Sequence, residues 1–110
     1  MARMPYIDPL ESSTAQYKLL AWEGPRRMLE WKLAAGESDT LHSHQESLLY
    51  FIKGGKIRLH ERKADSRDVE VGDGDTMAYD PWTGRVENIG GTDIHAILFE
   101  VQSVRSSAGG

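Results

Sequence analysis

Apolar and polar residues alternate along several short stretches of the chain, which is the pattern of β-strands with one buried face. The segment 27–33 is the clearest case, because Leu29, Trp31 and Leu33 fall on one face and Met28, Glu30 and Lys32 on the other. We therefore expect a half-buried strand here, with the indole of Trp31 directed inward.

Similar strands are expected at 17–22, 48–52, 56–61, 69–71, 76–79, 85–89 and 94–104, with glycine-rich turns between them. No helical period runs longer than a turn or two. Many short strands at this spacing predict an all-β barrel or sandwich. We expect a loose N-terminal arm at 1–16, a single barrel at 17–104 and a disordered tail at 105–110.

The pair Gly54-Gly55 separates two of these strands and favours a two-residue hairpin turn with Lys53 opposite Lys56. That register predicts an apolar, inward face made of Leu48, Tyr50, Ile52, Ile57 and Leu59. In the last strand, the same alternation predicts an inward face made of His95, Ile97, Phe99 and Val101.

His42 and His44 are two positions apart in a short expected strand, so their side chains point to the same face and lie close together. Such a pair can share one ligand or one metal ion. We expect both imidazoles to project into the barrel interior.

The sequence around this pair resembles the first motif of the cupin superfamily, with Gly36, His-x-His at 42–44, an apolar strand and a closing Gly55. The segment 74–88 resembles the second motif. Over residues 27–101 the resemblance implies a jelly-roll barrel, the double-stranded β-helix. Two positions depart from the family pattern: Leu48 stands at the position of a glutamate ligand, and Gly84 at that of the last metal histidine.

The resemblance also implies a divalent transition metal, such as iron, manganese, nickel, copper or zinc, bound by Nε2 of His42 and His44. Two protein ligands are fewer than the three or four of most functional sites. Glu46 from the neighbouring loop and His95 from the last strand are the candidate third ligands. No organic cofactor is expected.

Without a metal, the two imidazoles would be neutral groups in a polar pocket, hydrogen-bonded to water, Tyr50 or Asn88. Neighbouring imidazoles disfavour double protonation, so one of them can serve as a general base near pH 7. His42, His44 and Tyr50 are therefore the candidate catalytic residues.

A ligand pocket is expected to be mostly apolar, with few polar groups. The residues expected to line it are Trp31, Leu48, Trp82, Asn88, His95 and Phe99. Leucine in place of glutamate at position 48 makes the pocket drier, which favours an aromatic or polyketide-like molecule over a charged one.

A net charge of −4 gives no basic surface for nucleic acid or an anionic membrane, and no apolar run is long enough to span a bilayer. The chain has no cysteine, which excludes disulfides and thiolate chemistry and agrees with a cytoplasmic location. We expect a homodimer, formed through the outer sheet and the N-terminal arm, since most soluble oligomers are two-fold dimers.

Two classes of function follow from these features. In the first, the chain is a small isomerase, lyase, cyclase or dioxygenase that acts on a carbonyl, enol or aromatic substrate through a metal or through histidine acid/base chemistry. In the second, it is a non-catalytic cupin that binds a small molecule and has lost its metal site. The intact histidine pair favours the first, and the departures at Leu48 and Gly84 favour the second.

Overall fold

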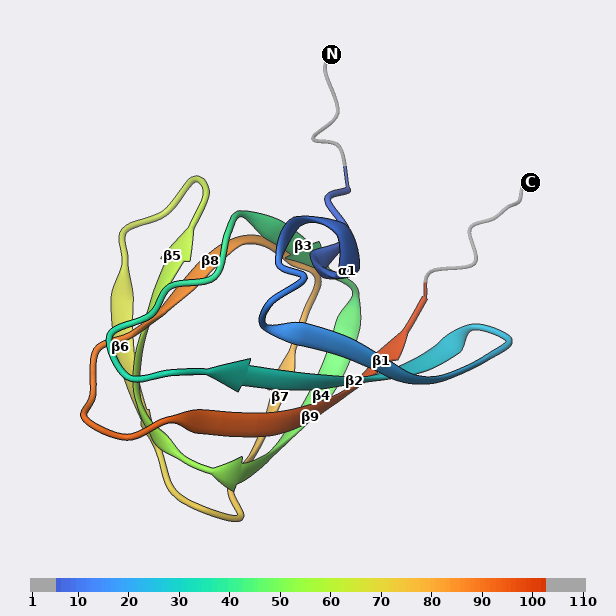
Figure 1. The fold of residues 1–110 in the computed structure, drawn as a ribbon. Coiled ribbons are helices and arrows are strands. Elements are labelled where there is room, and N and C mark those ends of the chain that lie inside the picture. The colour runs from blue at the N-terminus through green and yellow to red at the C-terminus, as the bar shows by residue number, and fades with distance from the viewer. Residues whose placement is uncertain (1–5, 103–110) are drawn as a thin grey trace.

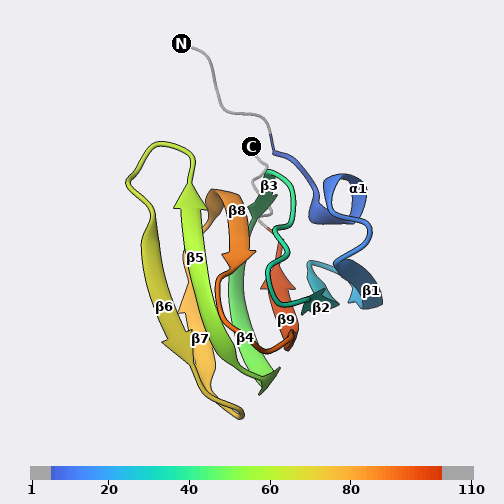
Figure 2. The same ribbon diagram turned by 60° about the vertical axis from the view of Figure 1, so that its left-hand side comes forward.

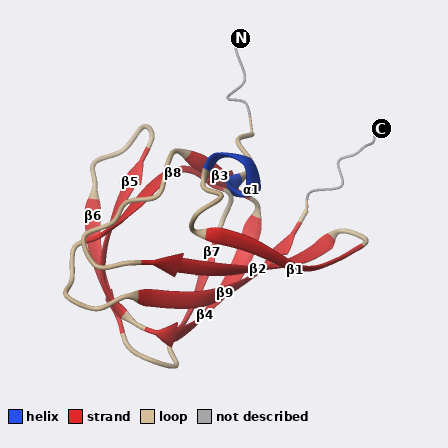
Figure 3. Ribbon diagram, in the orientation of Figure 1, coloured by secondary structure: helices blue, strands red, loops and turns tan. Residues whose placement is uncertain are grey.

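A computed structural model describes residues 6–102 of the chain, and almost all of its regular structure is β-strand (Figure 1). The elements in chain order are α1 (Pro9–Ser12), β1 (Tyr17–Glu23), β2 (Arg26–Leu33), β3 (His42–His44), β4 (Glu46–Lys53), β5 (Gly55–Glu61), β6 (Arg67–Val71), β7 (Thr76–Tyr79), β8 (Trp82–Asn88) and β9 (Ile94–Val101). Within the described part, the one helix is the short α1 beside the barrel (Figure 3). The predicted all-β class is confirmed.

The strands form two antiparallel sheets that face each other across the core, and Figure 2 shows them as two layers. One sheet has the order β1-β2-β9-β4-β7 and the other the order β3-β8-β5-β6. Both sheets contribute the alternate, inward side chains that form the core. Its largest members include Leu29, Trp31, Phe51, Ile57 and Leu98, each at most 2 % exposed. The prediction that Trp31 points inward is confirmed.

The predicted hairpin at Gly54-Gly55 is wrong, because the chain crosses here from one sheet to the other. Lys53 pairs with His95 in the first sheet, whereas Lys56 pairs with Glu70 in the second. A side chain on Gly54 would collide with the backbone carbonyl of Val71, so this corner needs glycine for a close approach of two chain segments.

The predicted inward faces of β4 and β9 are also wrong. Leu48, Tyr50 and Ile52 are 58, 50 and 41 % exposed, and the intervening Leu49 and Phe51 fill the core instead. In β9 the buried residues are Ile94, Ala96, Leu98 and Glu100. On β5 the predicted burial of Ile57 and Leu59 is correct, so the error in β4 arose from carrying the side-chain alternation through a turn that is not a hairpin.

The N-terminal segment 6–16 is packed against the barrel, in contrast to the loose arm expected there. The Asp8 side chain caps α1 by accepting from the backbone N–H of Leu10 at 3.0 Å. Ile7 exchanges two hydrogen bonds with Ser43, one at 2.6 Å and one at 3.0 Å. This segment therefore closes the edge of the barrel next to β3. The predicted tail 105–110 lies outside the described residues.

A search of residues 6–102 finds no helix with the length and apolarity needed to cross a membrane.

Candidate functional site

His42 and His44 lie side by side in the barrel interior, as the sequence predicts. They occupy the two ends of β3, where His42 pairs with Gly84 and His44 with Trp82 of β8. Their exposures are 0 and 5 %, and the ring centroids are 4.6 Å apart. The alternation of side chains along a strand brings both rings to the same side, and the described residues around them leave almost no contact with solvent.

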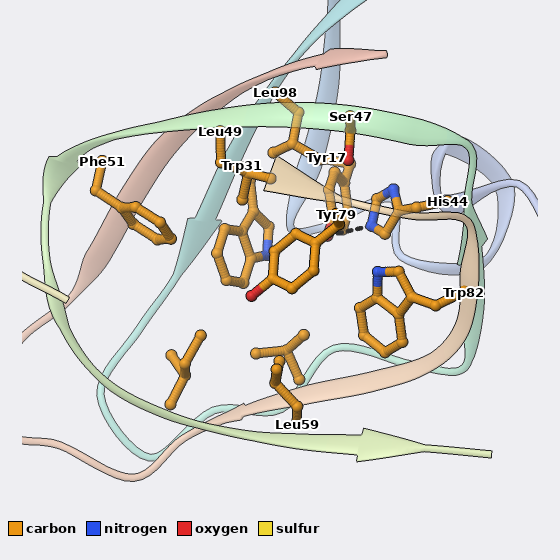
Figure 4. A pocket seen from close by; sticks show the side chains of 12 residues that line it. Tyr17, Trp31, His44, Ser47, Leu49, Phe51, Leu59, Tyr79, Trp82 and Leu98 are labelled. Carbon is orange, nitrogen blue, oxygen red and sulfur yellow. Dashed lines mark hydrogen bonds between the residues drawn. The ribbon is translucent and has the colours of Figure 1, made fainter. Parts of the chain in front are cut away.

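The hydroxyl group of Tyr17 lies between the two imidazoles. Its oxygen is 3.3 Å from Nε2 of His42 and 3.1 Å from Nε2 of His44, and Figure 4 shows the second contact. Tyr17 is the first residue of β1 and the one buried residue of that strand. The five-stranded sheet thus places a phenol directly against the histidine pair of the other sheet.

The other ring nitrogens fix the tautomers of both histidines. Nδ1 of His42 is 2.6 Å from the carbonyl oxygen of Thr40, and Nδ1 of His44 is 2.6 Å from a carboxylate oxygen of Glu100. A carbonyl and a carboxylate only accept hydrogen bonds, so each Nδ1 carries a proton and each Nε2 presents a lone pair. One hydroxyl proton on Tyr17 therefore serves two acceptors.

Glu100 belongs to a buried chain of alternating charges. Its second oxygen accepts from Nε of Arg27 at 2.8 Å, and the far end of that guanidinium contacts Asp8 at 2.9 Å. Burial alone would raise the pKa of Glu100, but the hydrogen bonds and charges of His44 and Arg27 lower it below its ordinary value. Glu100 is thus an ionised carboxylate that orients the His44 ring.

Burial also sets the protonation of the neighbouring groups. Burial, together with the nearby His44, lowers the pKa of His42 to about 4, so this ring is neutral near pH 7. Burial, together with the negative charges of Asp39 and Glu100, raises the pKa of Tyr17 and keeps its phenol protonated.

Asp39 is a further buried acid next to the pair, with one oxygen 3.7 Å from Nδ1 of His42. Burial raises its pKa to about 7, against the opposing effects of the Val86 N–H, the Arg85 charge and the Trp31 indole. Below pH 7 the Asp39 carboxyl group is therefore mostly protonated, while the His42 ring stays neutral down to about pH 4.

A small cavity lies beside His44 in the centre of the barrel (Figure 4). Its volume is about 20 Å³, which is room for about one water molecule. Its polar lining includes Tyr17, His44, Ser47 and Tyr79, and the rest of its wall is apolar or aromatic, with Trp31 and Trp82 among the largest side chains. The structure thus places two of the predicted pocket residues, Trp31 and Trp82, at the cavity.

Four predicted site residues lie on the outer face of the five-stranded sheet, away from the histidine pair. Tyr50 and Leu48 are exposed, and Phe99 lies beside Leu48 on the same outer face. Glu46 is also exposed there, at the start of β4. Their predicted inward orientation is wrong because Ser47, Leu49 and Phe51 take the inner positions of β4, and Leu98 and Glu100 take those of β9 around Phe99.

The two remaining predicted site residues are engaged in other contacts. His95 points outward from β9 and its Nε2 is 2.7 Å from a carboxylate oxygen of Glu30. Asn88 is fully buried, but its amide donates to the backbone carbonyls of Leu33 and Thr92 at the end of β8 remote from His42. Asn88 therefore stabilises the turn between β8 and β9 and does not face the histidine pair.

The residues around the histidine pair do not fit the metal centre that the sequence resemblance implies. No group of three or more histidine, aspartate or glutamate side chains suited to a metal occurs within residues 6–102. The position of the family's glutamate, Leu48, faces outward, and Glu100 already bonds His44 and Arg27. At Gly84, a Cβ atom would collide with the backbone of β5 and would lie 2.6 Å from the Trp82 ring. A histidine at position 84 would therefore require β5 and the Trp82 ring to move.

Four members of this polar cluster were not predicted from the sequence: Tyr17, Arg27, Asp39 and Glu100. Arg27 has the same parity as Leu29 and Trp31, and Glu100 the same parity as Leu98, so each charge ends an otherwise apolar face. An opposite charge at the end of each face was the available signal, because buried charges must be paired.

Solved structures of similar fold support the architecture. A cupin domain from Bordetella pertussis Tohama I has a TM-score of 0.71 and 13 % identity, over 94 % of this chain and 100 % of that one. A protein with a double-stranded β-helix domain from Klebsiella pneumoniae has a TM-score of 0.63 and 13 % identity, over 96 % of this chain and 95 % of that one. A cupin family protein from Methanocaldococcus jannaschii has a TM-score of 0.61 and 14 % identity, over 93 % of each chain.

No family model and no curated protein matches this sequence. At identities this low, the similarity shows the fold and carries no information on the reaction. The two antiparallel sheets, the interior histidine pair and the structural neighbours together show that this chain has the cupin fold, the double-stranded β-helix.

Proposed function

We propose that this chain binds a small carbonyl or enol compound inside its barrel and moves a proton on it, with His44 as the base and without a metal. The observation that carries the proposal is the Tyr17 hydroxyl between the two Nε2 atoms, with Glu100 behind His44. A carboxylate behind a histidine fixes its tautomer and stabilises the imidazolium that forms when the ring takes a proton.

The Tyr17 hydroxyl can donate its hydrogen bond to His42 instead of His44. When the hydroxyl donates to His42, Nε2 of His44 is left with a free lone pair next to the cavity. That nitrogen takes a proton from the carbon next to the substrate carbonyl, and the C–H electron pair moves into an enolate. Return of the proton from His44 to another carbon or oxygen atom of the enolate completes an isomerisation.

Exchange of substrate protons with deuterium tests this proposal directly. The protein is incubated in D2O with a panel of enolisable ketones, and the loss of α-proton signals is followed by NMR. We expect exchange above the buffer rate with the wild type, and a loss of at least about 100-fold in His44→Gln. His60→Gln is the matched control, since His60 contacts Glu87 on the outside of the barrel.

Elemental analysis and chelation separate this proposal from a metal mechanism. We expect less than stoichiometric metal in untagged protein and unchanged exchange after treatment with a chelator. Exchange that stops on chelation and returns with one metal would support the metal-dependent enzyme instead.

A non-catalytic binding protein is the second candidate, and it is favoured by Leu48 and Gly84, because neither position supplies the metal ligand that the family pattern has there. Saturable binding of compounds from the panel, with exchange at the buffer rate for all of them, would establish that reading.

A further inference from the structure

Two buried polar groups at the central cavity have no hydrogen-bond partner among residues 6–102. They are the hydroxyl of Ser47 and the indole N–H of Trp31, in residues that are 4 and 2 % exposed. Both side chains are directed toward the cavity (Figure 4). A buried donor without a partner is unfavourable, so this arrangement suits a ligand that brings a hydrogen-bond acceptor. The Trp31 N–H lies beside Asp39, which leaves Ser47 as the freer donor.

We infer that the cavity recognises the carbonyl oxygen of an uncharged aromatic compound, and that Ser47 is the residue that selects for it. This inference rests on the proposed function and names its substrate class. Ser47 lies on β4 and His44 ends β3, and both line the same cavity. A carbonyl bound to Ser47 therefore has its neighbouring carbon close to the proposed base.

The charges around the cavity favour a neutral ligand. Glu100 is ionised, so an anion would meet repulsion. The buried cation Arg27 is held by Glu100 and Asp8. Both oxygens of Glu100 are also engaged, which leaves no carboxylate oxygen for an ammonium group.

Three residues, Leu59, Tyr79 and Trp82, form a wall between this cavity and an outer cleft of about 510 Å³. The rings of Tyr79 and Trp82 are 6.2 Å apart, and Trp82 packs 5.9 Å from His44. Outward movement of the Trp82 indole would join the two spaces and leave a volume the size of an aromatic ring next to His44. A flat ring in place of the indole preserves these ring contacts.

Titration with three matched probes tests the inference, with the indole N–H signals of Trp31 and Trp82 as the NMR readout. Acetophenone has the ring and the carbonyl, ethylbenzene lacks the acceptor, and benzoate carries a charge. We expect acetophenone to bind about five- to tenfold more tightly than either of the other probes, which is the effect of one hydrogen bond.

Variants identify the residues responsible. Ser47→Ala should bring the Kd of acetophenone to that of ethylbenzene, whereas Thr76→Val, which removes an exposed hydroxyl from the same sheet, should not. Trp82→Leu should lower the Kd of both neutral probes and keep the preference for acetophenone. The amide spectrum of each variant confirms that it is folded.

Three results would overturn the inference. They are tightest binding of benzoate, a preference for acetophenone that survives in Ser47→Ala, and absence of acetophenone binding in both the wild type and Trp82→Leu. Proton transfer is tested separately, because His44→Gln should lose exchange and keep the acetophenone preference.

Discussion

The phenolic proton of Tyr17 is shared between two buried imidazole nitrogens, so its removal leaves two lone pairs without a donor. We expect Tyr17→Phe to lower the free energy of unfolding by about 1–3 kcal/mol, the cost of buried polar groups without partners. Urea unfolding measures the change. Tyr50→Phe removes an exposed hydroxyl and should stay within about 0.5 kcal/mol of the wild type. Equal effects of the two variants would contradict the shared hydrogen bond.

Asp39 and His42 have pKa values that are shifted in opposite senses. The pKa of Asp39 rises from 3.8 to about 7, so between these pH values the native state keeps a proton that the unfolded chain releases. The bound proton stabilises the native state, and this contribution to the free energy of unfolding is lost as the pH rises. The pKa of His42 falls from 6.5 to about 4, so between these pH values the unfolded chain binds a proton that the native state does not. The free energy of unfolding therefore decreases as the pH falls. Between pH 4 and 6.5 the two effects oppose each other.

In Asp39→Asn, the pH dependence of the free energy of unfolding that comes from His42 should no longer be offset by Asp39. Asparagine keeps the acceptor for the Val86 N–H and loses the titration. From pH 6.5 to 4, the free energy of unfolding of this variant should fall relative to the wild type by on the order of 3 kcal/mol. Urea unfolding at a series of pH values measures it. A difference between variant and wild type that does not change with pH would show that Asp39 is not a buried neutral acid.

At the scale of the strands, Arg27 ties together three parts of the fold: β2, β9 through Glu100, and the N-terminal segment through Asp8. Removing one partner of a buried ion pair leaves the other uncompensated. We therefore expect Arg27→Ala to destabilise the protein by about 3–5 kcal/mol in thermal or urea unfolding. Arg58→Ala breaks an exposed pair with Asp68 that solvent screens, so it should cost much less. Similar losses in both variants would argue against a special role of the buried pair.

Strand alternation predicted the buried face of β2 correctly and that of β4 incorrectly, because the two strands differ in how polar their second face is. In β2 one face is apolar and the other carries Glu30 and Lys32, so one orientation is favoured. In β4 both faces are apolar, because Leu48, Tyr50 and Ile52 remain on the surface. The hydrophobic pattern then leaves the orientation open, and the choice depended on a hairpin that does not exist.

The candidate site was predictable in its strand pattern and not in its long-range contacts. The spacing of His42 and His44 is a local feature that a strand turns into proximity. The contacts of Tyr17 and Glu100 with this pair join strands that are 25 and 56 residues away in sequence. Such contacts depend on which strands are neighbours in the sheets, and no local pattern encodes that.

On the scale of the whole molecule, the outer face of the five-stranded sheet is unusually apolar. Strand register places Met28, Phe99, Leu48 and Ala78 in one row across β2, β9, β4 and β7, with Tyr50 and Ile97 in the next row. Contiguous exposed apolar surface of this kind is typical of an interface. A two-fold dimer would use the same face of both subunits, so one interface would bury these apolar residues in each of them.

We therefore expect a homodimer through this face, with a mass by light scattering at micromolar concentration twice that of the chain. A stable interface buries about 800 Å² on each partner. Leu48→Lys places a charge in the centre of the apolar row and should give a monomer. Glu70→Lys changes a charge on the exposed face of the other sheet and should leave the dimer intact. A monomeric wild type, or a dimer that is disrupted by Glu70→Lys and not by Leu48→Lys, would place the interface elsewhere or exclude it.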